Sequence, residues 1–307
     1  MNKEEKLRVI SYGEVLWDCF PGHKNIGGAP LNVALRMQSL GCDVSIISCI
    51  GKDEDGEKIK TYLEEHGVNT SGIAENTQYQ TGTVDVTLND RGSATYEITY
   101  PSAWDKIPFT ETAGQLVSAS DLIVYGSLAC RDEVSQSTLH RLLSNHNIHK
   151  VFDANLRYPH YTIETVKPLM EKADFIKFND DELYEIAEAI GSPYKSMEQN
   201  MEYIAGKTAT PSICVTKGRH GAVLLQNGKL YYNSGYNITV KDTVGAGDSF
   251  LAALLTHLFH FKSSPQKAVN FACAMGAMVA ESKGANPVID QTAIKNLMTG
   301  KSEVKAT

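Results

Sequence analysis

A glycine-rich segment, Asp242–Phe250 (DTVGAGDSF), precedes an apolar helical stretch and carries residue types suited to chemistry on an anion. Gly245, Ala246 and Gly247 are small, so their backbone amides can approach a ligand closely. The unpaired N–H groups and the positive dipole end of the following helix would attract a phosphate. Asp248 stands in the first helical turn, where a carboxylate can accept the proton of an attacking hydroxyl. A structural interpretation is also open, in which the glycines form a turn and Asp248 complements the helix dipole.

Polar residues also end several apolar runs elsewhere in the chain. They are Asp18, Asp153, Asn155, Asn179 and Thr216–Gly218. Ligands of parallel sheets bind at the carboxyl ends of the strands, so these residues are candidates for a binding site. Each also has a structural interpretation, because such residues form turns and cap the N-termini of helices.

Strand-like and helix-like segments alternate along the chain. The expected strands are Leu7–Leu16, Val44–Ile50, Leu122–Tyr125, Val151–Asp153, Phe175–Phe178 and Ile213–Val215. The expected helices include one opened by Gly27–Pro30, then Glu54–His66, Asp181–Ile190, Met197–Ala205, and Ala246–His260 and Pro265–Ser282, which finish the fold. These repeated units predict an α/β fold, a doubly wound, mostly parallel sheet flanked by helices on both faces with right-handed crossovers.

Two β-hairpins interrupt this pattern. Thr83–Leu88 and Ser93–Ile98 alternate apolar and polar residues around a turn at Asn89–Gly92, and Val223–Leu225 with Leu230–Tyr232 form the second hairpin. The first hairpin is too small to be an independent domain. A hairpin that projects from an α/β sheet is a candidate lid.

The composition of the 307 residues, 42% hydrophobic and 21% charged, is that of an ordinary globular protein. A net charge of −7 without a basic run argues against a nucleic-acid or anionic-membrane partner. The six cysteines form no C-x-x-C pair and the histidines show no metal-ligand spacing, so the cysteines are expected to be small buried hydrophobes. We expect a cytoplasmic enzyme, since no apolar segment has the length of a signal or a membrane span.

The segment DTVGAGDSF closely resembles the C-terminal signature of the ribokinase, or PfkB, family of carbohydrate kinases. IGGAPLNVA at 26–34 resembles the N-terminal sugar-binding segment of that family, and the two motifs stand in the family order, about 210 residues apart. The segments 13–18, 103–107 and 152–157 are most similar to those of bacterial fructokinases. The resemblance implies one ribokinase-like kinase domain over 1–307, with a small β lid from about 12–26 and 80–104.

The same resemblance implies roles for the residues that would handle ATP. Asp248 becomes the general base on a primary hydroxyl of the sugar, and the amides of Gly245, Ala246 and Gly247 become the hole for the γ-phosphate. The implied ATP-binding residues are Asn179, Thr216, Gly218, Lys283 and Gly284, with Glu182 organising Mg²⁺ through water and Asp242 and Thr243 near a possible K⁺ site. Taken alone, Asn179 and Glu182 are better explained as a helix cap and a surface charge, and Thr216–Gly218 as a plain turn.

For the sugar, the resemblance implies contacts from Asp18, Gly28, Asn32 and Arg157, and Trp104 either stacks on a sugar face or closes the base of the lid. Asn32 and Asp18 also have structural interpretations, as a helix-start residue and a turn former. The sequence departs from the usual FDPN of the family, because Ala154 replaces the proline. That change puts the stiffness of the loop in question but removes no ligand.

These features predict ATP-dependent phosphorylation of a sugar, with D-fructose giving fructose 6-phosphate. Alternatives are 2-keto-3-deoxygluconate kinase, ribokinase, a nucleoside kinase, or a sugar or nucleotide sensor without activity. An acid substrate would need a cation such as Arg157, whereas the intact catalytic segment argues against a sensor. The expected partners are the sugar and ATP, with a possible homodimer through the lid, whose exposed hairpin edge could pair with a second chain.

Overall fold

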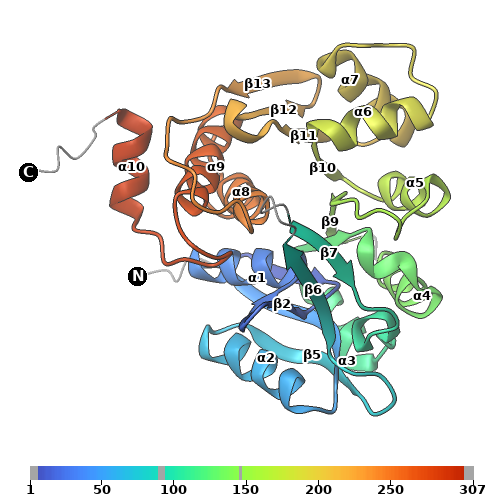
Figure 1. The fold of residues 1–307 in the computed structure, drawn as a ribbon. Helices are drawn as coiled ribbons and strands as arrows, with labels where there is room; N and C mark the ends of the chain where they lie inside the picture. The colour runs from blue at the N-terminus through green and yellow to red at the C-terminus, as the bar shows by residue number, and fades with distance from the viewer. Residues whose placement is uncertain (1–5, 89–93, 145–146, 301–307) are drawn as a thin grey trace, which may run out of the picture. The chain divides into compact units, whose positions relative to one another are not determined.

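The computed structural model describes residues 6–88, 94–144 and 147–300 (Figure 1). The chain divides into two compact units, an N-terminal unit of residues 1–172 and a C-terminal unit of residues 173–307. Among the described residues, no helix is long and apolar enough to cross a membrane.

The N-terminal unit contains five parallel strands in the order β9-β8-β1-β4-β5. Their bounds are β1 Arg8–Tyr12, β4 Asp43–Gly51, β5 Asn69–Asn76, β8 Leu122–Gly126 and β9 His149–Asp153. The central strand β1 is buried from Val9 to Tyr12, as the continuous apolar run predicted. Parallel pairing therefore brings the carboxyl ends of β1, β8 and β9 to one edge.

Helices and short 3₁₀ turns connect these strands. They are α1 Ala29–Ser39, α2 Glu54–Glu65, η1 Ala103–Lys106, α3 Glu111–Ser118, η2 Leu128–Arg131, α4 Glu133–Leu142 and α5 Ile163–Glu171. Side-chain oxygens cap the N-termini of several helices. In α2, for example, the Asp53 carboxylate accepts the N–H of Gly56. Helix α1 packs against β1, β4 and β8, so the chain just before it is fixed at the edge where polar residues gather.

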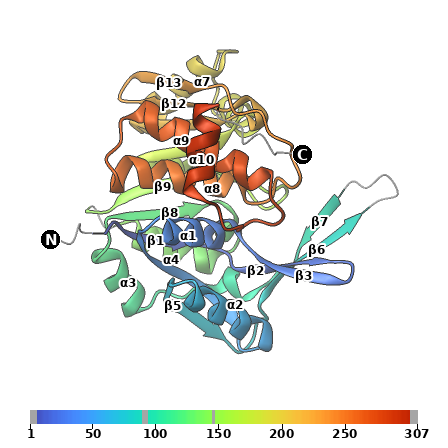
Figure 2. The same cartoon turned by 90° about the vertical axis from the view of Figure 1, so that its left-hand side faces the viewer.

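A second sheet of four strands, in the order β3-β2-β6-β7, projects from this unit (Figure 2). It consists of β2 Leu16–Phe20, β3 His23–Gly27, β6 Gly82–Leu88 and β7 Ala94–Ile98. Leu16, Val84 and Val86 form its apolar cluster, with Phe20 and Ile98 packed against them. The hairpin predicted in this region is confirmed as β6 and β7, and its turn at 89–93 lies outside the described residues. Its function as a lid stays a prediction.

The prediction of one strand over Leu7–Leu16 was wrong. The chain leaves the large sheet after Tyr12 and enters the small sheet at Leu16. Gly13 makes the break possible with a φ of 144°, and a methyl group there would lie 2.6 Å from the Pro30 ring. The apolar run conceals this corner because residues 9–17 are buried on both sides of it. Strand β5 was not anticipated, whereas β3 falls in the segment of about 12–26 that was expected to contribute to the small β lid.

The C-terminal unit contains the parallel strands β10 Phe175–Asn179 and β11 Ser212–Thr216 and the antiparallel β12 Ala222–Gln226 and β13 Lys229–Asn233. The predicted second hairpin is therefore present. Its turn, Asn227–Gly228, has positive φ at both residues, the conformation that tight two-residue hairpins require.

The helices of this unit are α6 Asp180–Ala189, α7 Met197–Thr208, α8 Ala246–Leu255, α9 Pro265–Ala280 and α10 Gln291–Thr299. Helix α8 packs along α9 and continues into a π-helical turn, Thr256–His260. The expectation that the fold finishes near Ser282 was wrong, since α10 follows. Only Ile294 of α10 is buried, so its sequence lacks a clear apolar stripe. Five of the six cysteines are buried and Cys19 is partly buried, which confirms the expectation for most of them.

Candidate functional site

The start of α8 is fixed by a close approach of two backbone segments in the C-terminal unit. Gly245 caps the helix with a φ of 73°, and a Cβ at this position would lie 2.6 Å from the Cβ of Ala285. Any side chain would therefore strain the turn and collide with the 283–286 segment. The absence of a side chain at Gly245 thus lets the segment with the predicted residues Lys283 and Gly284 lie next to the predicted catalytic segment.

The carboxylate of Asp242 strengthens this junction. One oxygen accepts the N–H of Val244 at 3.0 Å and the other accepts the N–H of Gly284 at 3.0 Å. The Thr243 side chain is exposed, and its carbonyl accepts the N–H of Ala246 at 3.2 Å. Of the three amides predicted to form an anion hole, that of Ala246 is therefore engaged within the turn.

The space beside Gly247 is lined by a lysine that the sequence analysis did not single out. Lys177 of β10 is only 6% exposed, and its Nζ lies 3.7 Å from the position a Gly247 Cβ would occupy. No closer atom of the described chain fills that position, so the protein itself does not require glycine here. A buried cation next to a helix start, with Asp248 one residue further in the first turn, suits a negatively charged ligand.

Asn179 and Glu182 form a reciprocal capping box at the start of α6. The Asn179 side chain accepts the Glu182 N–H at 2.8 Å, and the Glu182 carboxylate accepts the Asn179 N–H at 2.8 Å. The structure thus shows the helix-capping role that the sequence left open. A metal role for Glu182 stays a prediction, because these contacts are those of a helix cap. No group of three or more acidic, His or Cys side chains among the described residues could hold a metal directly.

The strand end next to Asn179 carries the other predicted ATP residues. Thr216 pairs with Asn179 across β10 and β11, and its hydroxyl donates to the carbonyl of Phe178 at 3.4 Å. Gly218 begins a short 3₁₀ turn with a φ of 52°, is exposed, and would meet no atom within 4 Å if it carried a Cβ. The open backbone at Gly218 leaves room for a flat ligand against the chain.

In the N-terminal unit, Asp18 lies on the apolar face of the small sheet. Leu16, Asp18 and Phe20 are two residues apart on β2 and therefore share one face, and Asp18 pairs with Val84 of β6. Burial among these side chains raises the pKa of Asp18 to about 6. No hydrogen bond to its carboxylate is found within the described residues, so the group is available to accept the hydroxyls of a ligand.

Two glycines make room for this carboxylate and for the turn into α1. A methyl group on Gly27 would overlap the Asp18 carboxylate, and one on Gly28 would lie 2.5 Å from the Glu14 carbonyl oxygen. Gly28 has a φ of 112° and begins α1, and its carbonyl accepts the Asn32 N–H at 2.9 Å. The small sheet therefore brings Asp18 beside the Gly27–Gly28 pair, with the buried Asn32 one helical turn further along.

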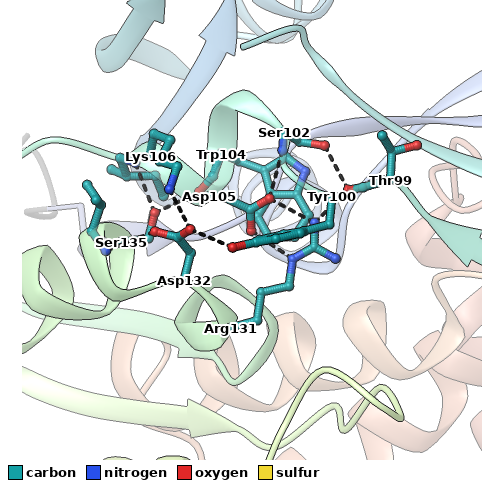
Figure 3. Close-up of polar contacts among 11 residues, drawn as sticks. Thr99, Tyr100, Ser102, Trp104, Asp105, Lys106, Arg131, Asp132 and Ser135 are labelled. Atoms are coloured by element: carbon teal, nitrogen blue, oxygen red, sulfur yellow. Dashed lines mark hydrogen bonds and ion pairs between the residues drawn. The ribbon is translucent and has the colours of Figure 1, made fainter. Parts of the chain in front are cut away.

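The other two predicted sugar residues are placed differently. Trp104 has no exposed surface, and the Arg131 guanidinium covers its ring at 4.1 Å, which favours the packing role over stacking on a sugar (Figure 3). Arg157 is exposed, and its guanidinium donates to the Leu156 carbonyl at 3.1 Å. No contact joins Arg157 to Asp18, Gly28 or Asn32 within the described chain.

A small pocket of the N-terminal unit lies at the carboxyl ends of β1, β8 and β9. Its lining includes Glu14, Pro30, Ser127, Asp153 and Asn155. Asn155 has a φ of 38°, a left-handed conformation that is unusual outside glycine. Of the polar strand ends that were expected to gather, Asp153 and Asn155 therefore lie together here.

The predicted residues thus form two sets, one in each unit. The sugar residues belong to the N-terminal unit and the ATP residues to the C-terminal unit. Sequence reasoning missed Lys177. A lone lysine in the apolar run Phe175–Phe178 was the available signal, because a buried cation needs an anionic or polar environment.

Comparison with protein families and curated proteins identifies carbohydrate kinases as relatives. A family model described as "pfkB family carbohydrate kinase" matches residues 2–292. Fructokinase-2 of Oryza sativa subsp. japonica is 26% identical over 321 residues, which cover 96% of this chain and 94% of that protein. Fructokinase-1 of the same plant is 28% identical over 309 residues, covering 91% and 93%.

Solved structures are similar over nearly the whole chain. An uncharacterised sugar kinase from Pyrococcus horikoshii in complex with ATP has a TM-score of 0.79 and 26% identity, covering 91% of this chain and 94% of its own. A fructokinase from Vibrio cholerae O395, with fructose, ADP and calcium bound, has a TM-score of 0.81 and 24% identity, covering 95% and 99%. The predicted ribokinase-like fold is thereby confirmed.

Desolvation of the Asp18 carboxylate predicts a stability cost at neutral pH. Its folded pKa of about 6 exceeds the unfolded value of 3.8, so ionisation above pH 6 opposes folding. Asp18→Asn should raise the free energy of unfolding at pH 7 by about 1–3 kcal/mol. Urea denaturation at a series of pH values should show this difference shrinking between pH 7 and pH 4, as wild-type Asp18 becomes protonated.

Asp85→Asn on the neighbouring strand β6 is the matched control, because that side chain is exposed. It should change stability by less than about 0.5 kcal/mol. Equal stability of Asp18→Asn and wild type at pH 7 would show that the Asp18 carboxylate is not desolvated.

Proposed function

Because the chain belongs to the pfkB family of carbohydrate kinases, we propose that it transfers the γ-phosphate of ATP to a primary hydroxyl of a sugar, with D-fructose as the substrate and fructose 6-phosphate as the product. The choice of fructose is supported by the fructokinases that match over more than 90% of the chain at 26–28% identity. The use of ATP is supported by the similar sugar kinase that was solved with ATP.

The observation that carries the proposal is the space at the start of α8. Gly247 borders a position that the described protein leaves open, and the Lys177 ammonium stands 3.7 Å from it. Phosphoryl transfer depends on positioning and on neutralising charge at the transferred group. The amide of Gly247 and the cation of Lys177 supply both at one point.

The chemistry assigned to the chain's own residues is a proton transfer within a positioned pair of reactants. Asp248 accepts the proton of the primary hydroxyl as the oxygen attacks phosphorus. The Asp18 carboxylate and the Asn32 carboxamide hold other hydroxyls of the sugar, so the reacting hydroxyl is presented in one orientation. Closure of the small sheet over the sugar would exclude water that could otherwise attack ATP.

Glu182 would hold Mg²⁺ through water, and the ion would neutralise phosphate oxygens. A K⁺ ion would bind next to the junction of Thr243 with the 283–286 segment, which Asp242 and Gly284 hold together by a hydrogen bond. Lys283, Thr216 and Gly218 would contact the nucleotide.

The direct test is the release of ADP by the purified protein with MgATP and K⁺, measured across a panel of acceptors. D-fructose, D-ribose, 2-keto-3-deoxygluconate, D-glucose and adenosine distinguish the kinases considered above, and a reaction without acceptor gives the background. A preference for D-fructose, with phosphate on carbon 6 by NMR of the product, is the expected result. Turnover of another acceptor alone would replace fructose as the substrate, and no turnover above background would contradict the proposal.

Asp248→Asn tests the base. It should lower kcat by ~10²–10⁴-fold, because the amide cannot accept the proton, while the Kd for the sugar changes little. Steady-state kinetics and calorimetric binding measure the two effects separately. A variant that keeps near-wild-type kcat would remove Asp248 from this role.

Gly247→Ala tests the phosphate position without disturbing the fold. The added methyl has room against the protein, and alanine in a helix is favoured by ~0.5–1 kcal/mol over glycine, so Tm should hold or rise. It should still lower kcat/KM for ATP by about tenfold or more, because the methyl would occupy the site of the phosphate.

Gly245→Ala is the contrasting variant. The positive φ and the close contact with Ala285 should cost it more than about 1 kcal/mol of stability. Unchanged ATP kinetics in Gly247→Ala would place the phosphate elsewhere.

A further inference from the structure

Arg131, at the end of η2, forms a buried ion pair at the base of the small sheet (Figure 3). Its Nε donates to one oxygen of Asp105 at 2.7 Å and its Nη2 to the other at 2.8 Å. The side chains of the pair are 4% and 0% exposed. This bidentate geometry fixes the guanidinium plane as well as its charge.

The pair is connected to the end of β7 through Thr99. Nη2 of Arg131 donates to the Thr99 carbonyl at 2.6 Å, and the hydroxyl of Ser102 donates to the same oxygen at 2.9 Å. Thr99 in turn donates its N–H to the Thr83 carbonyl at 3.0 Å, and the two threonine hydroxyls lie 2.8 Å apart. Arg131 therefore holds β7, and through it β6, at the point where they leave the rest of the unit.

A second connection runs through Trp104. The guanidinium lies 4.1 Å from the centre of the indole ring. The indole packs so closely on Gly82, the first residue of β6, that a methyl group there would overlap it. Gly82 pairs with Leu16 of β2, which stands two residues before Asp18.

The segment η1, which carries Asp105, is also anchored to the start of α4. Ser135 of α4 accepts the Ile107 N–H at 2.9 Å and donates to the Trp104 carbonyl at 2.8 Å. Lys106 pairs with Asp132 at 2.6 Å, and Asp132 is the N-cap of α4. Because η1 is held by these independent contacts, loss of Arg131 would release the strands and not the segment beneath them.

We propose that Arg131 is a positioning residue for the sugar site: through the ends of β6 and β7 and through Trp104 it holds β2, and with it the Asp18 carboxylate, in the geometry that binds the sugar. The inference rests on the proposed function, because it assigns Asp18 to sugar binding. Neither Arg131 nor Asp105 contacts the sugar in this assignment.

The energetics favour a geometric role over a stabilising one. A buried ion pair contributes little net stability, because desolvation offsets the attraction of its charges. Here the hydrogen bonding is also incomplete, since Nη1 of Arg131 and Nε1 of Trp104 are buried without a hydrogen-bond partner among the described residues. Such an arrangement costs free energy and specifies the position of what it contacts.

The test is Arg131→Lys, which keeps the charge but loses the planar guanidinium that donates to both Asp105 and Thr99. The KM for the sugar should rise by about tenfold, while the KM for ATP and kcat at saturating sugar change by less than about threefold. Amide hydrogen exchange should be faster in β2 and β6 than in wild type. The matched control is Arg8→Lys, since Arg8 also forms a bidentate pair, with Asp121, but at the exposed start of β1. It should change neither readout.

The second variant combines Arg131→Met with Asp105→Asn. Removing both charges together leaves no unpaired ion in the buried site. A folded double variant with raised sugar KM and faster β2 exchange supports the proposal. Sugar KM and β2 exchange equal to wild type in Arg131→Lys would overturn it, as would an equal rise in both KM values.

Hydrogen exchange separates this proposal from the proposed function. If wild-type protein phosphorylates no acceptor, the kinase assignment fails, and the exchange of β2 amides in Arg131→Lys still decides whether Arg131 holds that strand. If wild type phosphorylates a sugar and the variant shows unchanged exchange, the positioning role alone fails.

Discussion

Two parallel strands can be neighbours in one sheet only if the chain crosses back between them, and this constraint determines where polar residues meet in each unit. In the N-terminal unit it brings Ser127, Asp153 and Asn155 to one pocket, at the carboxyl ends of β8 and β9. In the C-terminal unit it sets Asn179 beside Thr216. The strands are mostly apolar and resemble one another in composition. The few polar residues at and after their carboxyl ends are therefore the ones that can bind a ligand.

Asp105 and Asp18, both in the N-terminal unit, are accommodated by opposite means. Asp105 is fully enclosed and its charge is met by Arg131 and a backbone N–H. Asp18 lies on an apolar face with space provided by Gly27, and burial raises its pKa to about 6. A satisfied carboxylate organises structure, whereas an unsatisfied one is prepared for a ligand that supplies the hydrogen bonds. The contrast explains why burial alone does not identify a binding residue.

The sequence predicts the elements well where local signals agree, and the site in part. The strand and helix alternation, both hairpins and the turn at Asn227–Gly228 follow from periodicity and turn chemistry. The corner at Gly13 could not be located, because burial on both sides hides the change of sheet, and α10 has too little apolar surface to be recognised. The contacts of Arg131 and Lys177 depend on residues far away in the chain, and a single sequence carries no signal of such pairs.

Asp18 also places the protein under two opposing pressures. A neutral residue at this position would relieve the cost of desolvating a charge, while the ionised carboxylate is what a polyol can recognise. A library of variants sorted only for survival after heating would therefore drift towards neutral residues at position 18 and lose the carboxylate that we propose binds the sugar. Laboratory evolution of a more durable catalyst from this chain needs selection for turnover in every round, or position 18 held fixed from the start.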